Sequence, residues 1–176
     1  MWVVRALAAV SLVALGGCGA GESYGSLPPP AHSSSAACAA AGCGEAEVVV
    51  AQYRRFWAES LPAASGAAPG LRRAVLAPVT AEPELTHLVR SLAVLDGKGQ
   101  RSYGTDAPVS QTVRVNGLAA QVDGCLDSSR SGVADAITGK PITRGVARNP
   151  VSVEMVRGPD EIWRVAAVTY PGDTTC

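Results

Sequence analysis

A change in hydrophobic period near residue 100 constrains the fold of this chain more than any other sequence feature. Before it, apolar residues recur three and four positions apart, which is typical of amphipathic helices. From Gln100 onward, apolar and polar residues alternate, as they do in half-buried strands. Helices followed by a run of strands predict an α+β fold, because a wound parallel sheet requires the two kinds of element to alternate along the chain.

Three helices are predicted in the first part. The first covers residues 45–61 and is ended by Pro62 and the AASGAAPG stretch after it, because proline interrupts the helical hydrogen-bond pattern. A short second helix runs from Pro69 to Leu76, and Pro78 stops it. The third begins after Thr80 as N-cap, with Pro83 in its first turn, and ends before Asp96-Gly97. Its apolar face comprises Leu85, Leu88, Val89, Leu92 and Leu95.

Four strands are predicted in the second part. Residues 109–115 and 118–126 alternate and flank Asn116-Gly117, a strong signal for a two-residue hairpin turn. A polar loop follows, and then residues 151–156 and 162–168 alternate again on either side of a Gly-Pro-Asp turn. The strands are therefore expected to form an antiparallel sheet.

The amino-terminal segment predicts export. Residues 6–15 are apolar and follow a lone base, but they are too few to cross a hydrocarbon core of about 30 Å. They suit the apolar region of a signal peptide. The run ends in Leu15-Gly16-Gly17-Cys18, which resembles a bacterial lipobox. That resemblance implies removal of residues 1–17 and lipidation of Cys18, hence a chain anchored by lipid to the outer face of the cytoplasmic membrane. Ordinary secretion with cleavage elsewhere is the alternative.

Residues 18–44 are dominated by Gly, Ala, Ser and Pro, with almost no large apolar side chain. Such a composition cannot offset the entropy of ordering, so this segment is predicted to be a disordered tether. Residues 45–176 then form one folded domain. The whole sequence has 15 basic and 15 acidic residues, and the signal peptide holds only one of them. A near-neutral surface argues against nucleic acid as a partner, because phosphate neutralisation requires a basic stripe.

Four cysteines remain beside the lipidated one, and an even number in an oxidising compartment predicts disulfides. Three pairings are possible, and the sequence alone does not choose among them. We favour Cys125 with Cys176 and Cys38 with Cys43. A metal site is the rival interpretation, but no closely spaced Cys or His pair follows Cys43, so no metal ligands are assigned.

Four strings resemble small actinobacterial lipoproteins with an NTF2-like (SnoaL-like) domain: VVVAQYRRFW, AAQVDGCLDSSRSG, ITGKP and IWRVAAVTYPG. The resemblance covers residues 45–171. It implies a cone in which the amino-terminal helices pack on a curved antiparallel sheet. It also implies that the cone serves catalysis, small-molecule binding or subunit pairing, depending on the relative, so the fold does not name the function. Tyr53, Trp57 and Trp163 are the residues expected at the cavity of the cone.

No catalytic residues are assigned. Asp123 is expected to face outward, because it alternates with the valine face of its strand, and Tyr53 is expected in the core. His87, Asp106 and Asp127 are the other groups that enzymatic relatives could use. The sequence lacks nucleophile-elbow, zinc-protease, P-loop and dinucleotide motifs, and no cofactor is predicted.

Two functions follow from these observations. The first is a noncatalytic, lipid-anchored domain that binds a hydrophobic small molecule or an envelope protein. The alternative is a small cone-fold enzyme of isomerase or hydrolase type that acts on a hydrophobic small molecule.

Overall fold

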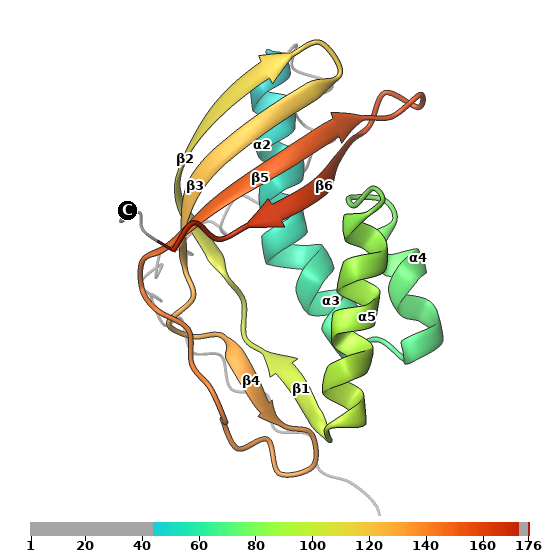
Figure 1. The fold of residues 1–176 in the computed structure, drawn as a ribbon, viewed down its shortest axis with the longest axis vertical. Helices are drawn as coiled ribbons and strands as arrows, with labels where there is room; N and C mark the ends of the chain where they lie inside the picture. Colours follow the sequence, from blue (N-terminus) through green and yellow to red (C-terminus); the bar gives the residue numbers. More distant parts are fainter. Residues whose placement is uncertain (1–43, 173–175) are drawn as a thin grey trace, which may run out of the picture. The chain divides into compact units, whose positions relative to one another are not determined.

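A computed structural model describes residues 44–172 and residue 176 (Figure 1). The predicted signal peptide, Cys18, Cys38, Cys43 and all but the last residue of the predicted tether lie outside the described residues. The helical elements are α2 (Glu45–Arg55), the π-helix η1 (Phe56–Ser60), α3 (Leu61–Gly66), the 3-10 helix η2 (Pro69–Leu71), α4 (Arg72–Leu76) and α5 (Glu84–Gly97). The strands are β1 (Gln100–Tyr103), β2 (Ala107–Asn116), β3 (Ala119–Asp127), β4 (Gly132–Asp135), β5 (Asn149–Arg157) and β6 (Trp163–Thr169).

The predicted end of the first helix at Pro62 is wrong. The chain passes from α2 through η1 into α3, and helical structure continues to Gly66. Pro62 lies in the first turn of α3, where a missing backbone N–H costs no hydrogen bond of that helix. The π-helical turn ahead of it shifts the hydrogen-bond register, so proline is accommodated without ending the run.

The start of the third helix also differs from the prediction. The N-cap of α5 is Pro83, and Thr80 is not the cap. Thr80 instead forms a parallel bridge with Val165 at the edge of β6, and its backbone N–H donates to the carbonyl of Leu76 at 2.9 Å. The second helix, from Pro69 to Leu76, is where it was expected.

The prediction of a curved antiparallel sheet behind amino-terminal helices is confirmed, and the fold is an α+β, cone-like one. The larger sheet has the order β2-β3-β5-β6, and every neighbouring pair is antiparallel. The hairpin between β2 and β3 is where it was predicted, but its two loop residues are Gly117 and Leu118, because Asn116 still pairs with Ala119; Gly117 has a φ of 59°. That left-handed conformation favours glycine and explains the Asn-Gly signal in the sequence.

A second, two-stranded sheet pairs β1 with β4, from Gln100 opposite Asp135 to Tyr103 opposite Gly132. The sequence analysis did not predict it. Each strand has four residues and no strict apolar alternation, so the pairing depends on contacts between distant parts of the chain. Residues 136–138 form the turn after β4, and Pro141 bridges back to Ala134.

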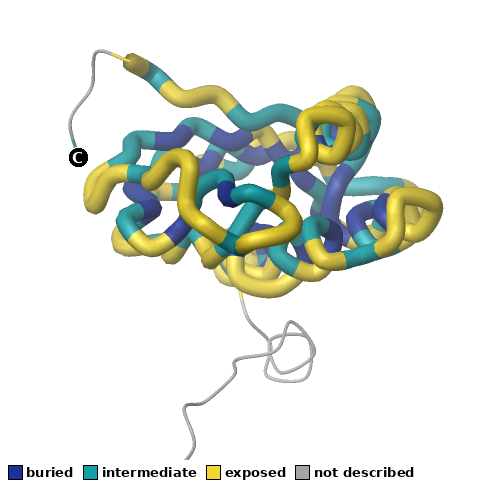
Figure 2. The backbone as a smooth tube through the Cα atoms, turned by 90° about the horizontal axis from the view of Figure 1, so that it is seen from below, coloured by how far each residue is buried: buried dark blue, intermediate teal, exposed yellow. Residues whose placement is uncertain are grey.

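The helices cover one face of the four-stranded sheet (Figure 1), and the main core lies between them. Figure 2 shows buried residues spaced along the backbone between intermediate and exposed ones, as alternation requires. The pairing of β5 with β6 shifts by one residue between Glu154 and Met155, which changes the alternation in β6. Trp163 and Val165 face the core. After the shift Val168 packs against the core, whereas strict alternation would place Ala167 there. Among the described residues, no helix is long and apolar enough to span a membrane.

Candidate functional site

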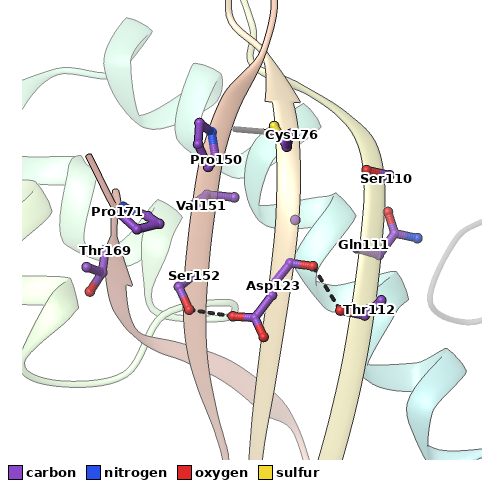
Figure 3. Close-up of a pocket in the computed structure, with 11 residues that line it drawn as sticks. Ser110, Gln111, Thr112, Asp123, Pro150, Val151, Ser152, Thr169, Pro171 and Cys176 are labelled. Atoms are coloured by element: carbon purple, nitrogen blue, oxygen red, sulfur yellow. Dashed lines mark hydrogen bonds between the residues drawn. The ribbon is translucent and has the colours of Figure 1, made fainter. Parts of the chain in front are cut away.

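A groove of about 600 Å³ lies on the face of the larger sheet that points away from the helices (Figure 3). Four strands and the carboxyl-terminal residue contribute to it. Its wall combines polar side chains with apolar surface. The polar residues are Ser110, Gln111, Thr112, Asp123, Ser152 and Thr169, and Pro150, Val151, Pro171 and the disulfide-bonded Cys176 supply apolar surface.

Strand register explains why these side chains share one face. Asp123 on β3 lies opposite Thr112 on β2 and opposite Ser152 on β5. Their neighbours Val122 and Val153, also opposite each other, are fully buried in the core. Because side chains alternate along a strand, burial of the valines directs the polar residues to the outer face. The expectation that Asp123 faces outward agrees with this geometry.

The carboxylate of Asp123 accepts hydrogen bonds from three side chains on three strands. The hydroxyl of Ser152 donates at 2.6 Å and the amide of Gln121 at 3.2 Å. The guanidinium of Arg114 completes the set with an ion pair. Thr112 donates from its hydroxyl to the backbone carbonyl of Asp123 at 3.4 Å. The five side chains form a polar network across β2, β3 and β5.

These contacts fix the charge of the groove. The hydrogen bond from Ser152, followed by those from Gln121 and Arg114, holds the pKa of Asp123 below its ordinary value. The side chain is therefore ionised at neutral pH. A carboxylate whose pKa is lowered is a weak proton acceptor, so this group is suited to hydrogen-bonded recognition more than to general-base catalysis.

A disulfide between Cys125 and Cys176 closes one end of the groove. The two Cα atoms are 5.7 Å apart, and the bond attaches the chain terminus to β3. Arg148 also donates from Nε to the carbonyl oxygen of Cys176 at 2.5 Å. The pairing is the one that the sequence analysis favoured.

The three residues expected at the cavity of the cone lie in the core. Tyr53 is fully buried, Trp57 is 2% exposed and Trp163 is 1% exposed. Trp57 packs edge-on against Tyr53 and Phe56, with ring centroids 6.3 and 4.8 Å away. Burial raises the pKa of Tyr53 to about 12, so its phenol is neutral. These aromatic side chains fill the interior between the helices and the sheet.

Trp57 also borders a second cavity of about 230 Å³, between η1, α3 and the smaller sheet. Asp106 lies at this cavity and accepts a hydrogen bond from the hydroxyl of Ser131. Asp127 accepts from the backbone N–H of Ser129 at 2.9 Å, a turn-stabilising role. His87 is exposed on α5. The structure thus leaves these candidates apart, and within the described residues no three His, Cys, Asp or Glu side chains gather to hold a metal.

Sequence analysis missed Glu84, the first residue of α5. It is only 7% exposed, and burial raises the pKa of its carboxyl despite the neighbouring His87, whose Nδ1 lies 3.4 Å away. An acidic residue after a proline predicts an exposed first helical turn, and only the tertiary packing buries it. Tyr170, which is 52% exposed, was likewise not singled out.

No family model matches the sequence, and neither does any curated protein. The intermembrane space region of the chloroplast protein ARC6 has a TM-score of 0.49 and 18% identity, covering 71% of this chain and 92% of that chain. The Kfla4162 protein from Kribbella flavida has a TM-score of 0.45 and 14% identity, and the match covers 74% of this chain and 90% of that chain. A proposed ketosteroid isomerase from Shewanella frigidimarina has a TM-score of 0.36 and 17% identity, and the match covers 72% of this chain and 94% of that chain. The α+β assignment therefore rests on the elements and register described above.

Proposed function

We propose that this chain is a lipid-anchored, extracytoplasmic and noncatalytic domain that binds an envelope protein through the outer face of its larger sheet. Support for the anchor comes from the resemblance of Leu15-Gly16-Gly17-Cys18 to a lipobox. The family proposed for the domain is the NTF2-like one, found here in an actinobacterial lipoprotein. The bound partner is a protein, because the groove offers hydrogen-bonding groups along an open sheet face.

The observation that carries the binding proposal is the ionised Asp123 network in a groove of about 600 Å³. Fixed donors and acceptors on a rigid sheet give orientation and specificity to a contact. The interior supports a hydrophobic ligand less well, because Tyr53, Trp57 and Trp163 occupy it. A protein segment with complementary polar groups suits the outer face better than an apolar molecule does.

The anchor is tested by replacing the lipidated residue. Cys18→Ala should prevent lipid attachment and move the protein from the washed membrane fraction to the soluble fraction, since the predicted anchor depends on that sulfur. Ser23→Ala, a nearby change that spares the lipobox, is the matched control and should stay in the membrane. A Cys18→Ala protein that remains in washed membranes would defeat the proposed anchor.

The groove is tested by site-specific crosslinking in cells. A photo-reactive residue at Thr112, which lines the groove, should give a discrete protein adduct, and the same residue at exposed Arg90 on α5 should not. Ser152→Arg fills the groove with a long side chain and should abolish the adduct from position 112. Equal adducts from both positions, or an adduct that survives Ser152→Arg, would contradict the proposal.

A small cone-fold enzyme is the second candidate, and the buried Glu84 is the observation that favours it. A carboxyl whose pKa is raised by burial is a typical acid-base catalyst in enclosed sites. Native mass spectrometry of protein isolated from its own membrane tests this function. A hydrophobic molecule that the wild type retains and converts to a product of altered mass, and that Glu84→Gln retains unconverted at unchanged stability, would favour the enzyme over the binding domain.

A further inference from the structure

The end of the molecule formed by the smaller sheet combines exposed basic residues with Ile137, which is more exposed than any other large apolar side chain described. We define the basic tip as residues 98–103 and 132–144, which include β1, β4 and the turn after β4. Its basic residues are Lys98, Arg101, Lys140 and Arg144, and its one acidic residue is Asp135. All four basic residues are exposed.

The basic residues of the tip have no ion-pair partner among the described residues. Several arginines outside the tip are paired: Arg72 binds Asp96 at 2.6 Å, and Arg164 binds Asp160 at 2.6 Å. The guanidinium of Arg101 lies beside Gly139, next to Lys140 in the turn. The tip therefore carries uncompensated positive charge that is available to an external anion.

The turn after β4 presents an isoleucine to solvent in a fixed conformation. Ile137 is 94% exposed and Ile142 is 53% exposed. The carboxylate of Asp135 accepts from the backbone N–H of Ile137 at 3.1 Å and from that of Thr138 at 2.7 Å. The backbone N–H of Ala136 donates to Gly99 at 2.9 Å. Because these bonds hold the turn, the exposure of Ile137 is a property of the folded domain.

We propose that the basic tip docks on the anionic phospholipid surface of the membrane that carries the lipid anchor. Basic side chains would lie against phosphate headgroups while Ile137 enters the boundary with the acyl chains. Charge complementarity selects this occupant: the tip is positive and apolar at once, and an anionic bilayer is negative with an apolar interior. The inference rests on the proposed anchor for bringing the domain to that membrane.

The length of chain ahead of the folded domain permits this orientation. The start of α2 lies at the end of the larger sheet that holds the β2–β3 hairpin: Glu45 pairs with Arg157 at 3.4 Å, and the backbone N–H of Arg157 donates to Leu118. Figure 1 shows β1 and β4 at the opposite end. The helical run from Glu45 to Gly66 spans only about 33 Å at 1.5 Å per residue. The tip lies beyond the end of that run (Figure 1), and residues 18–43 amount to at most roughly 90 Å of extended chain, well over twice the length of the run.

Vesicle sedimentation tests the proposal apart from the anchor. The chain of residues 18–176 carrying Cys18→Ala has no attached lipid, so any binding to vesicles is due to the protein surface alone. It should sediment with phosphatidylcholine vesicles that contain phosphatidylglycerol and stay in solution with pure phosphatidylcholine. Each basic side chain at an anionic surface contributes about fivefold to partitioning, so Arg101→Gln with Lys140→Gln should weaken binding about 25-fold. Arg54→Gln with Arg90→Gln removes equal charge from exposed helical positions and should change little.

A further variant separates the apolar contact from the charge. Ile137→Ser should weaken binding about tenfold without affecting folding, because the side chain is exposed in the free protein. Failure to sediment with anionic vesicles, or equal weakening by the two double variants, would overturn the docking proposal. Binding of the tip to an acidic protein, without binding to the anionic vesicles, would also overturn the docking proposal. The membrane fractionation of Cys18→Ala in cells reports the anchor separately, so loss of one proposal does not imply loss of the other.

Discussion

The two faces of the larger sheet are built from alternate residues of the same strands, and their contacts are of opposite kinds. On the inner face Val122 and Val153 lie opposite each other, fully buried beneath the helices. One residue along each strand, Asp123 and Ser152 lie opposite each other on the outer face and share a hydrogen bond. The inner face stabilises the fold through burial, whereas the outer face makes polar contacts that solvent could replace.

This difference shows where sequence change is tolerated. Burial of large apolar side chains contributes kilocalories per residue, and exposed ion pairs contribute about 1 kcal/mol or less. The outer face can therefore change its recognition properties with little loss of stability. Six substitutions measure the contrast.

The largest effect is expected for the two buried tryptophans. Trp57→Ala and Trp163→Ala should each lower the free energy of unfolding by about 3–5 kcal/mol, through lost burial and the cavity left behind. Denaturant unfolding measures both. A harmless Trp57→Ala would show that the helix contributes little to the core and would erase the contrast between the faces.

The disulfide joins the outer face to the chain terminus and should come next. Cys176→Ser opens a loop with a sequence separation of 51 residues and should cost about 2–4 kcal/mol. Thiol labelling of the denatured, unreduced wild type should modify neither Cys125 nor Cys176, and peptide mapping should recover them as one linked pair. Recovery of Cys125 linked to Cys38 would mean that the amino-terminal segment is attached to the sheet.

Gly124 tests how closely the helix approaches the inner face. A Cβ at this position would lie 2.8 Å from the Tyr53 hydroxyl and 3.0 Å from the Ser110 carbonyl. Gly124→Ala should therefore cost about 1–3 kcal/mol through overpacking. Adding Tyr53→Phe removes the nearer oxygen and should restore part of the loss. Additive effects of the two substitutions in a double-mutant cycle would contradict this close approach.

The elements that sequence predicts best are those fixed by neighbouring residues. Asn116-Gly117 and the alternation on both sides of it indicate the hairpin, because turn chemistry and side-chain period are local. The pairing of β1 with β4 could not be predicted in this way, since it joins distant, short and polar segments. Pro62 misled the prediction because its effect depends on the π-helical turn before it.

The candidate site was predicted only in part for the same reason. The outward direction of Asp123 follows from alternation with Val122, but its partners Arg114 and Ser152 depend on the register of three strands. Glu84 shows the opposite error: its position at a helix start indicates exposure, and packing against the rest of the domain buries it.

The smallest effect is expected on the outer face. Asp123→Asn removes a charge that is 41% exposed, so solvent screening limits its contribution to about 0.5–1 kcal/mol at neutral pH. Its folded-state pKa is lowered, so the stability it provides is present above the ordinary Asp pKa of about 3.9 and is lost as pH falls through the folded value. Unfolding of wild type and variant should therefore differ at neutral pH and converge in acid. A loss as large as that of Trp57→Ala, or a difference that persists in acid, would show that Asp123 belongs to the structural core and not to a surface for recognition.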